Sequence, residues 1–337
     1  MGFLSPNARP IMGFTIVVLT TMAANLPAHE ASHVAIGDTE MSTMYGATQS
    51  DGVGFGPVST PTACGALPSE VGCKVAATTE ETVRQPSLNT GLAFNIPARP
   101  QGAPTGSEFI RTIESVNIYK REAAILKELL SGNIPDFLRT AATVHTRFAG
   151  HEASITVMPD YLAIGSNTDF VRVPVNPQSA QKLAEAFGGV VPTKKIVDET
   201  YRQADVKLSP VAMHHSIGES RTFIGHHHRI ERQRQGKRLG ALTAGHKKDV
   251  INSRRAHRFP DRVCIYGWHK LPGAPIQPLS TVHDLHHVDY SHGLRLMQAT
   301  ITVDGRPTQV QEVLSNTELA GLLSHEGTLP TSLPTPS

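Results

Sequence analysis

From residue 107 onward, the spacing of apolar residues alternates between helical and strand-like patterns. Between Ser107 and Gly132, apolar residues recur three or four positions apart behind a serine suited to a helix N-cap, which predicts one or two helices. The Asn-Pro pair at 176–177 predicts another helix start, because asparagine caps N-termini and proline fits the first turn. Gly188 ends this helix, and a further helix is predicted from Pro192.

Strand-like segments separate these helices. Short stretches rich in β-branched residues and bounded by turn residues predict strands at 142–148, 153–160, 161–165 and 169–175. A basic helix is predicted over 219–235, then strands at 239–252, 262–269 and 289–303, and a last helix near 317–324. Because helices and strands interleave without a regular βαβ rhythm, the predicted fold is a single α+β domain with an antiparallel or mixed sheet and flanking helices.

The domain boundaries follow from where this periodicity begins and ends. Residues 1–28 have one positive charge, an apolar stretch and then small residues, which is the outline of a signal peptide. Residues 29–106 are rich in Gly, Ser, Thr and Pro and are predicted to be a low-complexity flexible linker. The α+β domain is expected over 107–326, followed by a disordered tail at 327–337.

A signal peptide implies a secreted or periplasmic protein with no transmembrane segment in the mature chain, because the apolar stretch is shorter than the about 20 residues that span a membrane. Cys64 and Cys73 could pair there, since disulfides persist in oxidising compartments, whereas Cys264 lies in an apolar run. No CxxC pair occurs, which argues against a zinc site built on thiolates.

Histidine is the residue whose abundance changes this picture. The chain has 17 histidines, and with these neutral its net charge is only +2, so it is not a polycation of the type that binds nucleic acid. Twelve of the histidines lie between residues 214 and 292. Because histidine titrates near neutral pH and is the commonest metal ligand, we expect the chemistry of this protein in that region. The sequence has no P-loop and no GxGxxG motif, so nucleotide cofactors are not indicated.

The segment VDYSHGLRL carries a dense set of reactive side chains. If it is a regular strand, Asp289 and Ser291 face one side and His292 faces the other, so Ser291 and His292 cannot act together in one pocket. A nucleophilic Ser291 then needs another histidine as its base, most simply His269 or His283. Asp289 would orient that histidine or ligate a metal.

Gly267-Trp268-His269 is followed, after 21 residues, by Ser291-His292-Gly293-Leu294-Arg295-Leu296. This order resembles the active-site motif of the L,D-transpeptidases of the YkuD type, which cross-link cell walls. The resemblance implies an acyl-transfer site and a cell-wall-type substrate. The family's nucleophilic cysteine has no counterpart here, because its position is deleted. A thiolate forms the acyl-enzyme in that family, so Ser291 is the only substitute nucleophile nearby.

The same region offers metal ligands in the pattern HxxHHxDxxH, formed by His283, His286, His287, Asp289 and His292. The pattern lacks a helical HExxH, and His283 and His287 share a face only if their segment is helical. A divalent metal such as zinc, bound by His283, His287 and Asp289, is one interpretation. The other is that these histidines are structural or lie on the surface.

A basic stretch between residues 224 and 250 has seven lysine and arginine residues against two acidic ones. It suits an anionic small molecule or polymer, or else forms a solvated helix face. No aromatic residue interleaves with these charges, which argues against binding of single-stranded nucleic acid. The predicted substrate-binding residues are Trp268, Arg295, Arg229, Lys247 and Lys248.

These patterns favour an exported hydrolase that acts on an anionic or cell-wall-type substrate. Its predicted catalytic residues are His269, Asp289, Ser291 and His292. A histidine would act as general base for Ser291 or for a water molecule, and Arg295 would bind an anionic group of the substrate through its planar fork. Two non-catalytic alternatives stay open: a secreted, effector-like protein that binds an anion or polymer, and a histidine-rich metal-binding protein.

Overall fold

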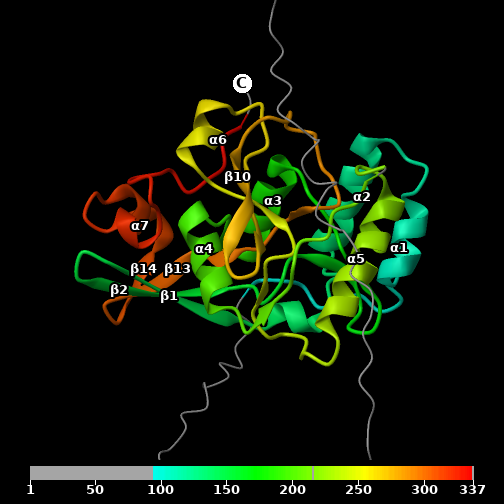
Figure 1. Cartoon of the computed structure of the whole chain (residues 1–337), viewed down its shortest axis with the longest axis horizontal. Coiled ribbons are helices and arrows are strands. Elements are labelled where there is room, and N and C mark those ends of the chain that lie inside the picture. The colour runs from blue at the N-terminus through cyan, green and yellow to red at the C-terminus, as the bar shows by residue number, and fades with distance from the viewer. Residues whose placement is uncertain (1–93, 215, 336–337) are drawn as a thin grey trace, which may run out of the picture. The chain divides into compact units, whose positions relative to one another are not determined.

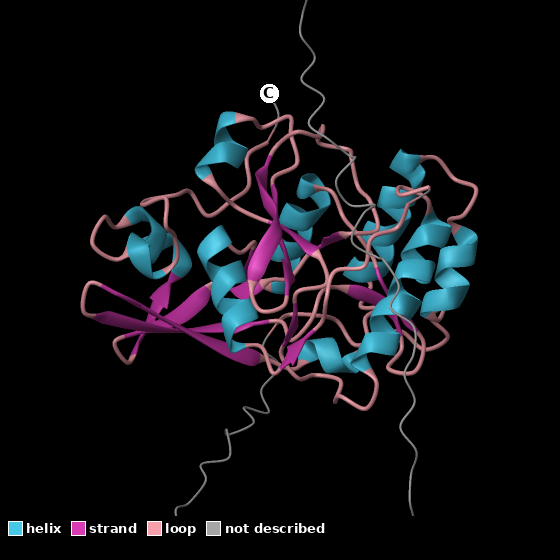
Figure 2. Ribbon diagram, in the orientation of Figure 1, coloured by secondary structure: helices cyan, strands magenta, loops and turns pink. Residues whose placement is uncertain are grey.

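The structure is a computed structural model, and it describes residues 94–335 with the exception of residue 215. The described residues combine helices with antiparallel and mixed sheets, which confirms the predicted single α+β domain (Figures 1 and 2). The predicted signal peptide, Cys64 and Cys73 lie outside the described residues, as does most of the predicted linker. Within the described part, no helix has the length and apolar character needed to cross a membrane.

The helices begin and end where the sequence supplies local signals. In α3 (Pro177–Phe187), Asn176 caps the N-terminus, and Gly188 ends the helix at φ +67°, a left-handed conformation that glycine adopts without strain. Thr193 caps α4 (Lys194–Gln203). The other helices are α1 (Gly106–Thr112), α2 (Ile118–Leu130), α5 (Ser220–Arg234), α6 (Arg254–Arg258) and α7 (Val310–Ser315). Two 3-10 helices, η1 (Asp136–Arg139) and η2 (Ala320–Leu322), complete the set, so the helix predicted near 317–324 is only a short 3-10 turn.

Two main sheets carry the fold. The six-stranded sheet has the order β14-β13-β2-β12-β5, with β1 also paired to β2, and all its pairings are antiparallel. Its strands are β1 (Ala142–Phe148), β2 (His151–Val157), β5 (Gly189–Val190), β12 (Met297–Gln298), β13 (Thr300–Val303) and β14 (Arg306–Gln309). The second sheet has four strands in the order β10-β9-β8-β11.

The four-stranded sheet is mixed, because β8 and β11 run parallel while its other pairs are antiparallel. Its strands are β8 (Lys248–Val250), β9 (Ile265–Lys270), β10 (Ala274–Ser280) and β11 (His292–Gly293). Two short pairs accompany the main sheets, β3 (Ala163–Gly165) with β4 (Phe170–Arg172), and β6 (Val206–Lys207) with β7 (Thr243–Ala244).

Helix α4 packs on both main sheets, where its neighbours include β1 and β9 (Figure 1). Ile196 and Tyr201 belong to the apolar cluster of the six-stranded sheet. Val197, one position further round the helix, packs with Ile251 and Tyr266 of the four-stranded sheet region. The helix predicted from Pro192 therefore packs on both sheets and connects them.

The strand predicted over 289–303 is wrong, because the chain crosses from one sheet to the other in this segment. It forms β11 in the four-stranded sheet and then β12 and β13 in the six-stranded sheet. Between them, the carbonyls of Leu294 and Leu296 accept hydrogen bonds from the N–H groups of Leu162 and Met158, at 2.8 and 3.0 Å. These bonds hold the crossing segment beside β2 and fix where β11 ends.

The domain extends beyond both of its predicted boundaries. Residues 327–335, predicted to be a disordered tail, pack on the domain: Leu329 and Leu333 are buried, and backbone groups of this segment bond to side chains of the domain. At the other end, Phe94 and Ile96 from the predicted linker are also buried in the core. Isolated apolar residues among prolines and threonines give no periodic signal, which is why the sequence did not predict this packing.

Candidate functional site

Residues 289–292 form a turn instead of the predicted strand. Oδ1 of Asp289 accepts hydrogen bonds from the backbone N–H of Ser291 at 2.6 Å and from its Oγ at 2.5 Å. The N–H of His292 donates to the Asp289 carbonyl at 3.1 Å. Aspartate favours such turns because its carboxylate can bond the backbone two residues further on. The predicted alternation is therefore wrong, and Nε2 of His292 lies 3.7 Å from Oδ2 of Asp289.

A second turn, at residues 283–287, brings two more histidines to the same place. The N–H of His287 donates to the Asp284 carbonyl at 3.1 Å, and the rings of His283 and His287 stack with their centroids 3.9 Å apart. Two backbone hydrogen bonds to residues 261–263 hold this turn against the domain. The sequence predicts that His283 and His287 lie on one face only if their segment is a helix. In the structure, a turn brings their side chains together instead.

His287, Asp289 and His292 converge into one cluster, which we call the His–Asp cluster. Their potential ligand atoms all lie within 4.8 Å of one another. Nε2 of His287 is 3.7 Å from Oδ2 of Asp289, the same oxygen that His292 approaches. The two oxygens of the Asp289 carboxylate therefore have different neighbours: Oδ1 binds Ser291, and Oδ2 faces the two histidines. His283 lies one ring further out, stacked on His287.

The histidine nitrogens of the His–Asp cluster lack hydrogen-bond partners. His292 is fully buried, and neither its Nδ1 nor its Nε2 has a partner; Nε2 of His287 has none either. A buried polar group left without a partner costs about 1–3 kcal/mol. Such groups are rare in native interiors, and each one requires an explanation such as a bound ion or water molecule.

The charge states in the cluster suit a bound cation. Burial alone would raise the pKa of Asp289, but the neighbouring side chains of His287, His292 and Ser291 hold it well below its ordinary value, so the carboxylate is ionised. Burial lowers the pKa of His292 to about 4, so this ring is neutral at pH 7. An ionised carboxylate and a neutral imidazole are the forms that ligate metals.

Two of the predicted substrate-binding residues lie beside the His–Asp cluster. In the four-stranded sheet, Lys248 pairs with His292 on one side and with Gly267 on the other. Nζ of Lys248 lies 4.9 Å from the centroid of the Trp268 ring. Burial lowers the pKa of Lys248, while the charge of Asp289 raises it, so the ammonium is within electrostatic reach of the cluster.

His269, the predicted base for Ser291, points to other partners. Its Nε2 lies 3.1 Å from Oδ1 of Asp198 on α4, and its ring stacks on Tyr201 with centroids 4.5 Å apart. Ser291 donates its hydroxyl to Asp289, and no hydrogen bond joins this hydroxyl to a histidine among residues 94–335. The structure therefore brings together Asp289, Ser291 and His292, but not His269.

The other three predicted substrate-binding residues either bind backbone carbonyls or lie on the surface. The buried guanidinium of Arg295 donates to the backbone carbonyls of Met158, at 2.6 Å, and Thr243. Lys247 is also buried, and its ammonium donates to a backbone carbonyl. Arg229 is exposed on α5. Arg295 and Lys247 thus hold backbone segments of the core together in this structure.

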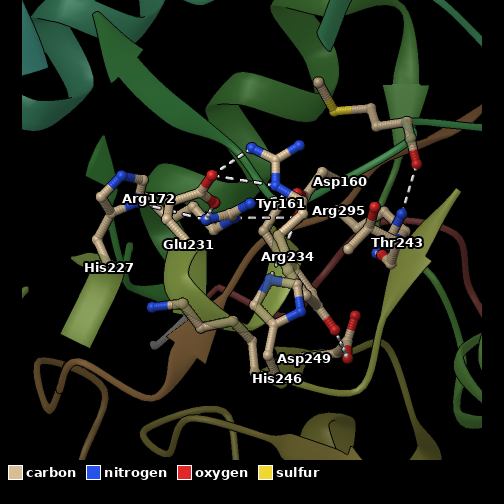
Figure 3. A network of polar contacts seen from close by, with 12 residues as sticks. Asp160, Tyr161, Arg172, His227, Glu231, Arg234, Thr243, His246, Asp249 and Arg295 are labelled. Atoms are coloured by element: carbon tan, nitrogen blue, oxygen red, sulfur yellow. Dashed lines mark hydrogen bonds and ion pairs between the residues drawn. The ribbon is translucent and has the colours of Figure 1, made fainter. Parts of the chain in front are cut away.

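A buried network of charged side chains surrounds Arg295, and sequence reasoning did not predict it (Figure 3). Arg172 binds Asp160 through two nitrogens, at 3.1 and 2.6 Å, and reaches Glu231 at 2.7 Å. Nε2 of His246 lies 3.3 Å from Oδ1 of Asp160. These partners come from different helices, strands and loops, up to 86 positions apart for Asp160 and His246, so no local pattern could have indicated them.

The basic stretch of the sequence divides between the surface and the core. The predicted basic helix over 219–235 is confirmed as α5. Arg234 on this helix is buried and forms an ion pair with Glu231, and Lys247 is buried as well. The exposed members of the stretch are Arg229, Arg232, Lys237 and Arg238. The seven positive charges therefore do not form one continuous face.

No protein-family model, curated protein or solved structure matches this chain. The resemblance to the L,D-transpeptidases stays a prediction that rests on its two short segments. One of them is in β9 and the other begins at β11, with β8 between them in the sheet. Cys264 is the one cysteine among the described residues, and burial raises the pKa of its thiol to about 12, so it does not replace the family's missing thiolate.

Proposed function

We propose that this protein is a metal-dependent hydrolase whose divalent cation is bound by His287, Asp289 and His292. The observation that carries the proposal is His292, which is fully buried, has no partner for either ring nitrogen and lies 3.7 Å from an ionised carboxylate. A cation between these groups would bind Oδ2 of Asp289 and one ring nitrogen of each histidine, because neutral imidazole and carboxylate are ligands of zinc and related metals.

The ligand set leaves room for chemistry. Two histidines and one carboxylate occur in catalytic zinc and iron sites, where the remaining positions take water or substrate. A zinc ion in such a site lowers the pKa of its bound water to about 7 and so supplies a nucleophile for hydrolysis. The His287 side chain is 26% exposed and His283 is exposed, so the cluster is open to solvent on this side.

Ser291 is a positioning residue in this proposal. Its N–H and hydroxyl both donate to Oδ1 of Asp289, which orients Oδ2 toward the two histidines. Hydrogen bonds to a ligating carboxylate typically change metal affinity by about 10- to 100-fold when they are lost. His283, stacked on His287, would steady that ring in the same way.

The proposal also keeps the predicted location and substrate. The signal-peptide outline of residues 1–28 supports a role outside the cytoplasm, on an anionic or cell-wall-type substrate. A histidine-rich metal-binding protein without catalysis would show the same metal content and no turnover. A panel of ester, amide and phosphoester substrates therefore separates the two functions once metal binding is established.

Metal analysis of protein purified without a histidine tag tests the site. We expect about one zinc ion per wild-type chain after zinc loading and dialysis, and loss of this ion in His292→Ala and Asp289→Asn. His228→Ala is the matched control, because His228 is an exposed residue of the same histidine-rich region and should keep the metal. If His292→Ala holds as much zinc as the wild type, the proposed site is wrong.

A further inference from the structure

Lys248 and Trp268 present two hydrogen-bond donors without acceptors beside the His–Asp cluster. Among residues 94–335, the Lys248 ammonium has no hydrogen bond and no ion pair, and it lies 4.9 Å from the centroid of the Trp268 ring. The indole Nε1 of Trp268 is buried and also lacks a partner. A buried donor without an acceptor costs about 1–3 kcal/mol, so the indole N–H favours a ligand that accepts hydrogen bonds, and the ammonium beside it favours an anionic one.

The charge balance around Lys248 indicates what kind of ligand this is. Lys248 pairs with His292, and Nε2 of His292 lies 3.7 Å from the carboxylate of Asp289. In the proposed function, this carboxylate is a metal ligand, so a divalent cation would neutralise the negative charge next to Lys248. The cluster with its cation and Lys248 then has a net charge of +2, and a desolvated site of this charge favours an anion.

We infer that Lys248 and the indole N–H of Trp268 form a subsite for an oxyanion, a carboxylate or a phosphate group, on the substrate of the neighbouring metal site. This inference rests on the proposed function and narrows its substrate class. The substrate is an ester, amide or phosphoester that carries a further free carboxylate or phosphate group. The pairing of Lys248 with His292 across β8 and β11 places this group next to the reacting bond. Ammonium groups bind oxyanions through charge-assisted hydrogen bonds, which are about twice as strong as neutral ones.

Trp268 itself provides the assay, because it is the only tryptophan in the chain. Protein that has been loaded with zinc and dialysed is titrated with inorganic phosphate and, separately, with acetate at constant ionic strength, while the tryptophan emission is recorded. We expect a saturable change with at least one anion, and the arm that binds more tightly identifies phosphate or carboxylate as the preferred group. Lys248→Gln should weaken this binding about tenfold or more, whereas Lys237→Gln, at an exposed lysine, should match the wild type.

The outcomes separate this inference from the proposed function. If the protein binds zinc but shows no saturable anion response, the subsite is wrong and the proposed metal site is still supported. The same conclusion follows if Lys248→Gln binds zinc and its anion titration matches that of the wild type. An anion response that Lys248→Gln removes, in a protein that binds no zinc, supports the subsite and overturns the proposed function. Retained zinc binding in Lys248→Gln shows that the variant is folded, so a lost anion response then supports the subsite.

Discussion

At the scale of single residues, Asp289 determines what its neighbours can do. One carboxylate oxygen accepts both hydrogen bonds from Ser291, and the other lies between His287 and His292. The sequence named all four residues as candidates, because their side chains are chemically reactive and closely spaced. Their pairing depends on a turn of four residues, and residue types alone do not specify whether such a segment turns or continues as a strand.

This pairing predicts how Ser291→Ala behaves. The variant should bind zinc about 10- to 100-fold more weakly, because Asp289 loses one of the two donors that orient it, yet remain active when metal is saturating. Zinc titrations and turnover at excess zinc measure the two effects separately. Ser315→Ala, at an exposed serine of α7, should leave both unchanged. If Ser291→Ala binds its metal but is inactive, the positioning role is wrong and Ser291 acts as the nucleophile.

At the scale of elements, local signals predicted the helices better than the strands. The caps at Asn176 and Gly188 bound α3 as the sequence indicated, because capping depends on residues within a few positions. The strand predicted over 289–303 failed because residues 291–297 are all buried, so their pattern gives no sign of where pairing changes. β11 is only two residues long, and its position depends on β8, which lies more than 40 residues earlier in the chain.

Close packing at β11 gives a prediction for Gly293→Ala. A Cβ atom there would lie 2.7 Å from Cδ1 of Tyr161 and 3.0 Å from Cβ of Lys247, so the strand has to shift. We expect a loss of about 1–3 kcal/mol in the free energy of unfolding, measured in urea, together with weaker zinc binding by the adjacent His292. Gly225→Ala, in helix α5 where the nearest atom is 3.7 Å away, is the control and should be neutral or slightly stabilising. Equal stability of Gly293→Ala and wild type would contradict this packing.

In the molecule as a whole, the net charge is only +2, yet several charged side chains are buried in the interior. Arg172, Arg295, Asp160 and Asp249 are buried (Figure 3), and so is Lys247. The sequence predicted that Arg295 and Lys247 bind substrate, and it made no prediction for Arg172. Composition cannot separate buried from exposed charges, because burial is decided by partners from other elements. Buried charges of this kind add little net stability even when paired, but leaving one unpaired is costly.

The buried ammonium of Lys247 predicts an unusual pH dependence of stability. Burial lowers its pKa from 10.5 to about 7. Between these values the unfolded chain binds a proton that the folded chain does not, so the free energy of unfolding should rise with pH, by up to about 1.4 kcal/mol per pH unit. Urea denaturation of metal-free protein at pH 7, 8 and 9 measures this slope. Lys247→Met should reduce it and Lys237→Met should not; a flat wild-type profile would contradict the prediction.

The packing of residues 327–335 has a consequence for the order of events during synthesis. Leu333 belongs to the same apolar cluster as residues of α1, α2 and α3, which leave the ribosome about 150 to 230 positions earlier. Domains generally fold as units, so this domain cannot complete its core before its last residues have left the ribosome. Until Leu333 has emerged, the apolar residues that it covers stay exposed. We therefore expect the nascent domain to bind chaperones until its synthesis is almost finished.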